Sequence, residues 1–356
     1  MSKALFEVGG DWGNWGAKVV TGSKQVIVEN VAVAYDGSED ELRGLGLFGD
    51  DLTTPYQVIP TESVRLSIGD TQWVVGAAAY NLNLRTRQQT SYERYGTDEW
   101  YALVCASFVS LFGGQSGAVG LTFSMPVTQF RAGTHHQVKE MLAGRHTVVH
   151  NGRQLTYEVR EDMIDMVPEG FGSLVYLCVS EDGLSFTDRD LAGSRVAVFD
   201  FGGFTMDINT YATLNLGPVN DSFDVGLIDV RNQVNQALKA RYNRGDVPTN
   251  ILDEVIRTKQ YSHAGGHPED VSDIVEPALV ELTKAALRVY QEGLGGGVDY
   301  QTIIITGGGG PVIGELLKPQ LNHQDVRIIP KGQAHLANAL GSLRHRKFKR
   351  EYLSSA

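Results

Sequence analysis

The chain has 356 residues, 42% of them hydrophobic and 21% charged, and a formal net charge of −11. This length favours two domains that each bury a core, and the acidic balance argues against a broad surface for bare nucleic acid. No apolar run approaches the roughly 20 residues that span a bilayer, and the N-terminus enters a strand with no room for a signal peptide. We therefore expect a cytoplasmic protein with no membrane segment.

Residues 5–20 predict a strand, a glycine-rich turn and a second strand, and we call residues 11–18 the first loop. Asp11 ends the first strand, and Gly13 lets the backbone turn tightly. Backbone N–H groups in such a turn form an anion site, the Asp carboxylate can hold a hydrated Mg²⁺, and Lys18 can reach a phosphate. An ordinary hairpin with a polar turn explains this motif equally well when it is considered alone.

Strands and helices alternate in the following part of the chain. In order, the sequence predicts short strands within residues 25–80, a polar surface loop from Gly37 to Pro60, an apolar helix from Thr97 as N-cap to about Phe112, a buried strand over 118–127, a basic helix over 129–142 and a polar hairpin over 148–157.

The strand–turn–strand motif appears a second time at residues 195–209, and we call residues 200–207 the second loop. Asp200 ends the strand, Gly202 and Gly203 form the turn, and Thr205 and Asp207 follow with a hydroxyl and a second acid. A single hairpin of this kind is common, but the occurrence of two in one chain is much less expected by chance. The two hairpins indicate two similar half-molecules that face each other across a cleft, with a phosphate chain and a metal ion between the turns.

A third glycine-rich segment comes late in the chain. After helices predicted at 225–242 and 275–294, the β-branched strand 302–306 runs into Gly307, Gly308, Gly309 and Gly310, which we call the glycine loop, and then into an apolar helix. Such a loop lets the backbone approach a ligand closely with a helix N-terminus behind it. A flexible connector explains the run alone, but after the two hairpins it is the expected third wall of a nucleotide site.

The remaining polar features predict no further catalytic chemistry. Cys105 and Cys178 lie in apolar stretches and are expected to be buried thiols. His263 and His267 lie in a glycine-rich segment that favours a loop over a metal site. The basic run 344–350 ends a helical pattern, where cations are favourable. We interpret it as a solvated helix end, with a patch for a partner or an acidic surface as the alternative.

The order of the three loops resembles the superfamily of ATPases that includes actin and hexokinase, and within it the ParM-like and bacterial actin-like (Alp) plasmid segregation proteins. The segments Val74–Ala78, Met125–Val127, Asp224–Gly226 and Ala337–Gly341 also match that group. The resemblance spans nearly the whole chain.

The resemblance implies a role for each matching position. Asp11 and Asp200 organise Mg²⁺ through water, and Glu169 polarises the attacking water; an exposed acid in a turn is the alternative for Glu169. The residues implied to bind ATP or GTP are Gly13, Asn14, Trp15, Lys18, Gly202, Gly203, Thr205, Gly226, Lys259, Gly307, Gly308 and Gly309. Trp12, Trp15 and Phe204 depart from the family pattern, so Trp15 is expected to pack against the nucleotide or under the first loop.

The implied fold is α/β, with two related ribonuclease-H-like domains around a nucleotide cleft. The first domain comprises residues 1–166 and 331–356, with a small subdomain inserted at about 31–96, and the second comprises 167–330. Closure on nucleotide changes the outer surface, and head-to-tail contacts that do not close produce a filament.

The leading hypothesis is a nucleoside triphosphatase whose filaments segregate plasmid or other DNA. The protein contacts itself in the filament and reaches DNA only indirectly, through a ParR-like centromere-binding adaptor. This role rests on the family resemblance, because a fold does not determine function. A small-molecule kinase of the same fold and a non-polymerising nucleotide-binding scaffold are the alternatives.

Overall fold

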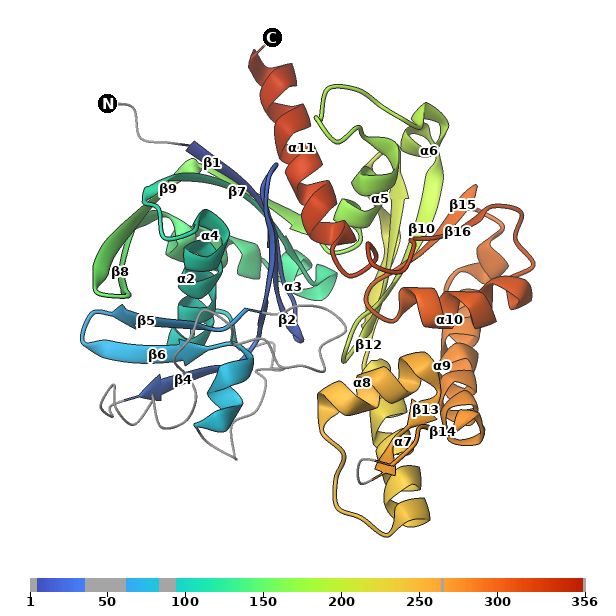
Figure 1. The fold of residues 1–356 in the computed structure, drawn as a ribbon. Coiled ribbons are helices and arrows are strands. Elements are labelled where there is room, and N and C mark those ends of the chain that lie inside the picture. Colours follow the sequence, from blue (N-terminus) through green and yellow to red (C-terminus); the bar gives the residue numbers. More distant parts are fainter. Residues whose placement is uncertain (1–4, 36–61, 83–93, 264–265, 355–356) are drawn as a thin grey trace. The chain divides into compact units, whose positions relative to one another are not determined.

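The computed structural model describes residues 5–35, 62–82, 94–263 and 266–354 (Figure 1). The described residues divide into two compact units: the first contains those up to Ala192 and those from Leu336 onward, and the second contains those within Gly193–His335. The predicted domain boundary at residue 167 differs from this division, because helix α5 (Phe171–Cys178) packs against the C-terminal helix α11 (Ala337–Ser354). Within the described ranges, no helix is long and apolar enough to cross a membrane.

The first unit is built on a mixed sheet whose centre is three parallel strands. β1 (Leu5–Trp12) pairs with β7 (Gly117–Met125), which pairs with β9 (Arg153–Pro168), and β1 also forms the predicted hairpin with β2 (Gly16–Val20). Within the described residues the sheet order is β3-β2-β1-β7-β9-β8-β5-β6-β4. The outer strands are β3 (Gln25–Glu29), β8 (Gly144–His150), β5 (Val64–Ile68), β6 (Thr71–Val75) and β4 (Ala32–Tyr35).

Helices cover both faces of this sheet. Alternate residues of β1 face opposite sides: Val8 joins the apolar cluster that contains Trp100 of α2 (Asp98–Phe112), whereas Gly9 lies against α11. Thr97 caps α2 as predicted, because its hydroxyl accepts a hydrogen bond from the Trp100 amide at 3.2 Å. A short 3-10 helix, η1 (Ala77–Asn81), and helix α6 (Arg189–Gly193) complete the unit.

The single basic helix predicted over 129–142 is wrong: α3 (Val127–Arg131) and α4 (Thr134–Leu142) are separate helices, because Gly133 has a left-handed φ of 84° between them. The predicted loop from Gly37 to Pro60 lies outside the described residues.

The second unit repeats the local topology of the first. β10 (Arg195–Phe201) pairs antiparallel with β11 (Met206–Ala212) and parallel with β15 (Thr302–Thr306), as β1 does with β2 and β7. The sheet is completed by β12 (Asn215–Phe223) and β16 (Val326–Ile328). This repetition confirms the prediction of two related α/β halves.

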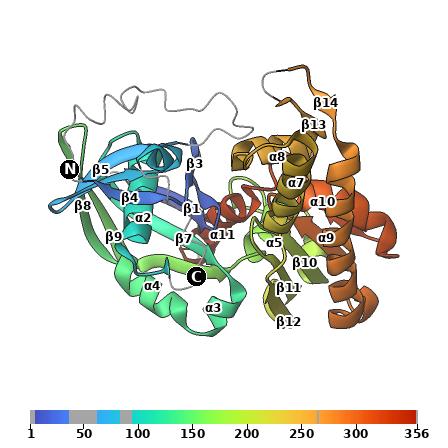
Figure 2. The same cartoon turned by 90° about the horizontal axis from the view of Figure 1, so that it is seen from below.

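Helices and a small hairpin complete the second unit. Helix α7 packs against α9 and α8 (Figure 2), and all three contribute to one apolar cluster with β10, β11 and β15. The elements are α7 (Leu227–Tyr242), α8 (Thr249–Thr258), α9 (Ser272–Gly293), α10 (Gly310–Leu317), η4 (Gly295–Gly297), η5 (Lys318–Gln320), β13 (Gln260–Tyr261) and β14 (Glu269–Asp270).

The basic end of α11 is not the solvated helix end that the sequence suggested. Arg346 is buried and donates to the Met163 carbonyl at 2.9 Å, close to Glu7 and Asp165. Arg344 donates to two backbone carbonyls near α5, and Lys349 and Arg350 pair with Asp165 and Glu7. The sequence prediction fails because of tertiary contacts. Acidic side chains of β1 and β9 neutralise the basic run, and carbonyl groups of β9 and near α5 accept its hydrogen bonds, so the run anchors α11.

Helix α11 approaches α5 more closely than side chains permit. A Cβ atom added at Gly341 would lie 1.7 Å from the backbone oxygen of Gly172. Both positions therefore require glycine, and the two helix backbones are in direct contact.

Gly341→Ala is expected to lower the free energy of unfolding by about 1–3 kcal/mol, because the added methyl forces α11 away from α5. Urea denaturation followed by circular dichroism measures this change. Gly193→Ala is the matched control, since nothing lies within 4 Å of a Cβ there. Equal midpoints for the two variants would contradict the close-packing argument.

Both cysteines are free and buried, as predicted. Burial raises the pKa of the Cys105 and Cys178 thiols from 9.0 to about 12. The folded state thus favours the neutral thiol. This stabilisation is complete below pH 9 and is lost as the pH rises from 9 toward 12.

Neither thiol is expected to react with Ellman's reagent in the native protein at pH 8, because the thiolate is the reactive form and both groups are inaccessible. Both are expected to react after unfolding in guanidinium chloride. Absorbance at the thionitrobenzoate band gives the count, and rapid native reaction at either position would show that its burial is transient.

Candidate functional site

In the first unit, the strand pairing of β1 and β2 brings Asp11 and Lys18 together. The two residues are cross-strand partners, and the Lys18 Nζ donates to Asp11 Oδ2 at 3.1 Å. The other carboxylate oxygen, Asp11 Oδ1, is buried and has no hydrogen-bond partner in the described part of the chain. This pair borders the turn, since a Cβ at Gly13 would lie 3.0 Å from Lys18 Nζ and 3.4 Å from Asp11 Oδ1.

The two tryptophans of the first loop have different positions. Trp12 is fully buried under the loop, stacked on Phe123 with ring centroids 5.0 Å apart. Trp15 packs against an apolar cluster that includes Val20 and Leu343. Both large rings therefore support the loop from the protein side.

Two buried residues that the sequence analysis missed hold this loop. Arg94 donates to the Asn14 side-chain oxygen at 2.5 Å and to the Trp12 carbonyl at 3.3 Å. The Asn30 side chain donates to the carbonyls of Gly13 and Asn14. Asn30 is not part of any motif and Arg94 follows a long segment of polar residues, so neither position carries a sequence signal for this contact.

Glu169 lies at the end of β9, where its N–H donates to the Met125 carbonyl at 2.7 Å and extends the pairing with β7. Its side chain is half-buried. The pKa of the nearby Tyr95 hydroxyl is raised, first by burial and further by the negative charges of Glu169 and Asp11. Asp11 pairs with Ser124 of β7, the residue before Met125, so the first unit places Asp11 and Glu169 on either side of the same end of β7.

Asn338 of α11 fixes the turn that follows Glu169. Its Oδ1 accepts from the N–H of Gly170 at 3.1 Å and from both the N–H and the hydroxyl of Ser173. These groups begin α5, whose first N–H groups have no partner within the helix. A side chain distant in sequence thus caps α5; the sequence analysis noted Asn338 only as part of a family motif.

In the second unit, the second loop has the same construction as the first. Asp200 and Asp207 are cross-strand partners, both buried, and Thr205 donates to Asp207 Oδ2 at 3.0 Å. The turn closes with the Gly202 N–H donating to the Thr205 carbonyl at 2.8 Å.

The glycine loop and the start of α7 both contact this second loop. A Cβ at Gly307, whose φ is 84°, would lie 2.3 Å from Asp200 Oδ1, and the Gly309 N–H donates to the Phe201 carbonyl at 3.0 Å. The Ile228 N–H, just after Gly226, donates to the Gly203 carbonyl at 2.8 Å. The second unit therefore assembles Gly202, Gly203, Gly226 and the glycine loop around Asp200, and Gly308 borders open space.

Lys259 is not among these contacts. It ends α8 in a left-handed conformation and pairs with Glu276 of α9 at 2.6 Å. Its predicted role near the nucleoside gains no support from this position.

The described residues contain no group of three or more His, Cys, Asp or Glu side chains that could hold a metal ion. Each unit offers instead one buried aspartate at the end of a strand, Asp11 or Asp200. Either carboxylate by itself fits Mg²⁺, which keeps several waters and takes one or two carboxylates together with phosphate oxygens.

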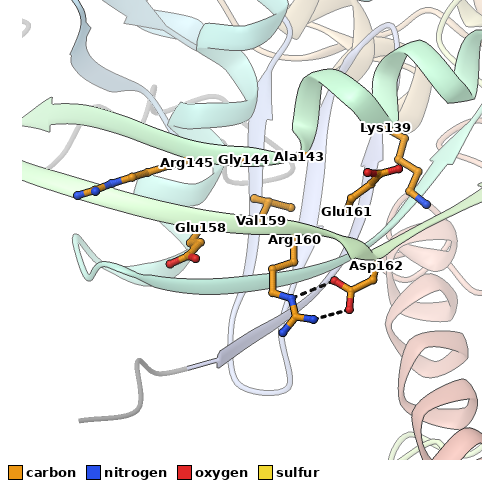
Figure 3. Close-up of a pocket in the computed structure, with 9 residues that line it drawn as sticks. All are labelled: Lys139, Ala143, Gly144, Arg145, Glu158, Val159, Arg160, Glu161 and Asp162. Atoms are coloured by element: carbon orange, nitrogen blue, oxygen red, sulfur yellow. Dashed lines mark hydrogen bonds and ion pairs between the residues drawn. The ribbon is translucent and has the colours of Figure 1, made fainter.

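A separate hollow of about 950 Å³ lies in the first unit at α4, β8 and β9 (Figure 3). Its charges are mixed, with Lys139, Arg145 and Arg160 alongside three acids. Arg160 and Asp162 pair with each other through two hydrogen bonds. The hollow contains none of the predicted site residues and has no net preference for an anion.

The paired Asp–glycine loops on duplicated sheets are the architecture of an actin-like ATPase fold. Two family models agree with this: the N-terminal domain of actin like proteins matches residues 9–172, and the C-terminal domain of the archaeal, MreB-like actin homologue matches residues 198–319. The predicted resemblance of the chain to actin-like ATPases of the ParM-like group is therefore confirmed. A search of curated proteins found no match.

Solved structures of the same fold cover nearly the whole chain. An archaeal actin homologue is 19% identical with a TM-score of 0.77, covering 97% of this chain and 99% of its own. A 15-stranded ParM filament from Clostridium botulinum is 17% identical with a TM-score of 0.71, covering 98% and 99%. Bacillus thuringiensis ParM with ATP is 18% identical with a TM-score of 0.67, covering 98% and 100%.

Asn338→Ala is expected to destabilise the protein by about 1–3 kcal/mol, because it leaves buried donors at the start of α5 unsatisfied. Asn338→Asp is the matched variant; it keeps an acceptor and adds a negative charge near a helix N-terminus, so a smaller loss is expected. Urea denaturation compares the two. If the alanine variant is as stable as the wild type, the cap does not stabilise α5.

Proposed function

We propose that this chain is a polymerising nucleoside triphosphatase, whose filaments assemble with bound triphosphate and disassemble after hydrolysis. The observation that carries the proposal is the duplicated loop: each unit ends a strand in a buried aspartate beside a glycine turn. Among its structural relatives, one is an archaeal actin homologue in complex with ADP and another is a ParM filament.

The site residues take the following roles in this proposal. Asp11 and Asp200 hold Mg²⁺ through water, where the metal neutralises charge on the phosphates. The phosphates bind to backbone N–H groups and to Lys18 and Thr205. Gly13, Asn14, Gly202 and Gly203 contact the phosphates, and Gly226, Gly307, Gly308 and Gly309 flank the nucleoside. Trp15 packs under the first loop, and Lys259, which pairs with Glu276, is the weaker candidate near the base or ribose.

Glu169 orients the attacking water. Phosphoryl transfer to water needs a positioned group that orients the nucleophile. Its side chain is half-buried and the residue lies at the same end of β7 as Asp11, which supports this role. The nucleotide is ATP or GTP, since the loops contact phosphates and not the base.

The cellular role we propose is segregation of plasmid or other DNA. The filament contacts DNA through a ParR-like adaptor, and the acidic net charge of −11 agrees with an indirect contact. Filament growth needs a head-to-tail contact between copies that does not close on itself. The protein acts in the cytoplasm, where the triphosphate is available.

The scaffold alternative gains no support from the positions of Arg344 and Arg346. It rested on the basic run at residues 344–350 as a binding patch, but Arg344 and Arg346 are engaged within the first unit. A kinase remains the second candidate only if triphosphate turnover rises sharply with one small-molecule acceptor.

Mg-ATP or Mg-GTP is expected to raise light scattering and pelleting of the wild type, followed by a decline as phosphate is released. Glu169→Ala is expected to polymerise but to persist, with phosphate release reduced by at least about 100-fold, the scale of a positioned acid–base group. Parallel scattering and phosphate assays measure both.

Glu161→Ala is the control, because this exposed acid lies on the same strand, β9, away from the loops. It is expected to behave as the wild type does. Filaments that form identically without nucleotide or Mg²⁺ would refute nucleotide-driven assembly.

A further inference from the structure

Four consecutive carbonyl groups of the first loop, those of residues 12–15, accept hydrogen bonds from two buried residues of the first unit. Arg94 Nη2 donates to the Trp12 carbonyl at 3.3 Å. Asn30 Nδ2 donates to the carbonyls of Gly13 at 3.5 Å and Asn14 at 3.3 Å, and the Asn30 N–H donates to the Trp15 carbonyl at 3.1 Å. Two residues, each 2% exposed, therefore bind four consecutive carbonyls.

This arrangement determines where the loop N–H groups point. In a planar trans peptide, the carbonyl and the N–H of the next residue point in opposite directions. With the carbonyls of residues 12–15 facing Arg94 and Asn30, the N–H groups of residues 13–16 face away from them. A row of N–H groups on one side of a turn is an anion-binding concavity.

Arg94 also orients the Asn14 side chain. Its Nη1 lies 2.5 Å from Asn14 Oδ1, and because a guanidinium can only donate, the atom that faces it must be the amide oxygen. The Asn14 NH₂ group therefore points away from Arg94, as a further donor. The same guanidinium donates to the Tyr95 hydroxyl at 3.0 Å. One planar group therefore donates to three acceptors, the Asn14 side chain, the Trp12 carbonyl and the Tyr95 hydroxyl. A lysine ammonium does not have the planar geometry that this arrangement needs.

We propose that Arg94 and Asn30 are positioning residues that pre-form the first loop for the phosphates of a nucleoside di- or triphosphate. Neither touches the ligand; they hold the backbone N–H groups and the Asn14 amide toward it. This inference rests on the proposed function and adds residues to it that lie in no motif. Pre-formed donors strengthen binding because less order is lost when the ligand arrives.

The test compares binding of a nucleoside with binding of its diphosphate and triphosphate. Calorimetry or fluorescent-analogue competition is performed with Mg²⁺ on the full chain. Arg94→Lys is expected to weaken di- and triphosphate binding by about tenfold, as for a lost charge-assisted hydrogen bond, and to leave nucleoside binding unchanged. Arg145→Lys, an exposed arginine of the same unit, is the control and is expected to bind all three as the wild type does.

The ratio of triphosphate to nucleoside affinity is the deciding readout, because a general loss of structure lowers both affinities together. An unchanged ratio in Arg94→Lys overturns the inference. If that variant does not fold, Asn30→Ala gives the same comparison, with the same ratio loss expected and an unchanged ratio again counting against the inference. A wild type that binds none of the ligands refutes the proposed function instead.

Discussion

The direct backbone contact between α11 and α5 is the constraint on which the first unit depends. Because Gly341 lies on Gly172 with no side chain between them, α11 sits close enough for Asn338 to reach the start of α5. The turn carrying Glu169 immediately precedes that start. The same helix sets Arg346 over β1 and β9 through Glu7 and Asp165. One helix therefore fixes both β1, which carries Asp11 near its end, and β9, which Glu169 directly follows.

Both units place a buried aspartate near the end of a strand by the same strand pairing. A strand paired in parallel with one neighbour and antiparallel with another ends in a buried aspartate, and the antiparallel partner returns a polar side chain opposite it: Lys18 opposite Asp11 and Asp207 opposite Asp200. The partner differs in charge, so the two carboxylates are not equivalent. Asp11 is neutralised by a cation, whereas Asp200 lies against Gly307, whose missing side chain leaves it room.

Local chemistry predicted much of this fold. Thr97 as a cap, the glycine turns at residues 13 and 202, and the β-branched strand at 302–306 all depend on short-range preferences that the sequence displays. The other contacts of the site depend on residues that are distant in sequence and therefore could not be predicted. Arg94, Asn30 and Asn338 hold loop and turn groups that lie 15 or more positions away, and the basic run at 344–350 appeared solvated only because Glu7 and Asp165 are distant in sequence. Gly133 is present in the sequence between α3 and α4, but a single glycine within a helical pattern does not by itself predict that the helix ends there.

The discontinuity of the first unit has a consequence for how the chain folds during synthesis. Its core needs α11, which is made after residues 193–335, while those residues form a contiguous unit whose strands and helices are all available earlier. Contacts between β1 and α11 close almost the entire length of the chain, and long-range closure slows folding. On the ribosome, residues 193–335 can therefore complete their core first, and Val20 of β2 and Ile27 of β3, which pack against α11, stay uncovered until that helix emerges.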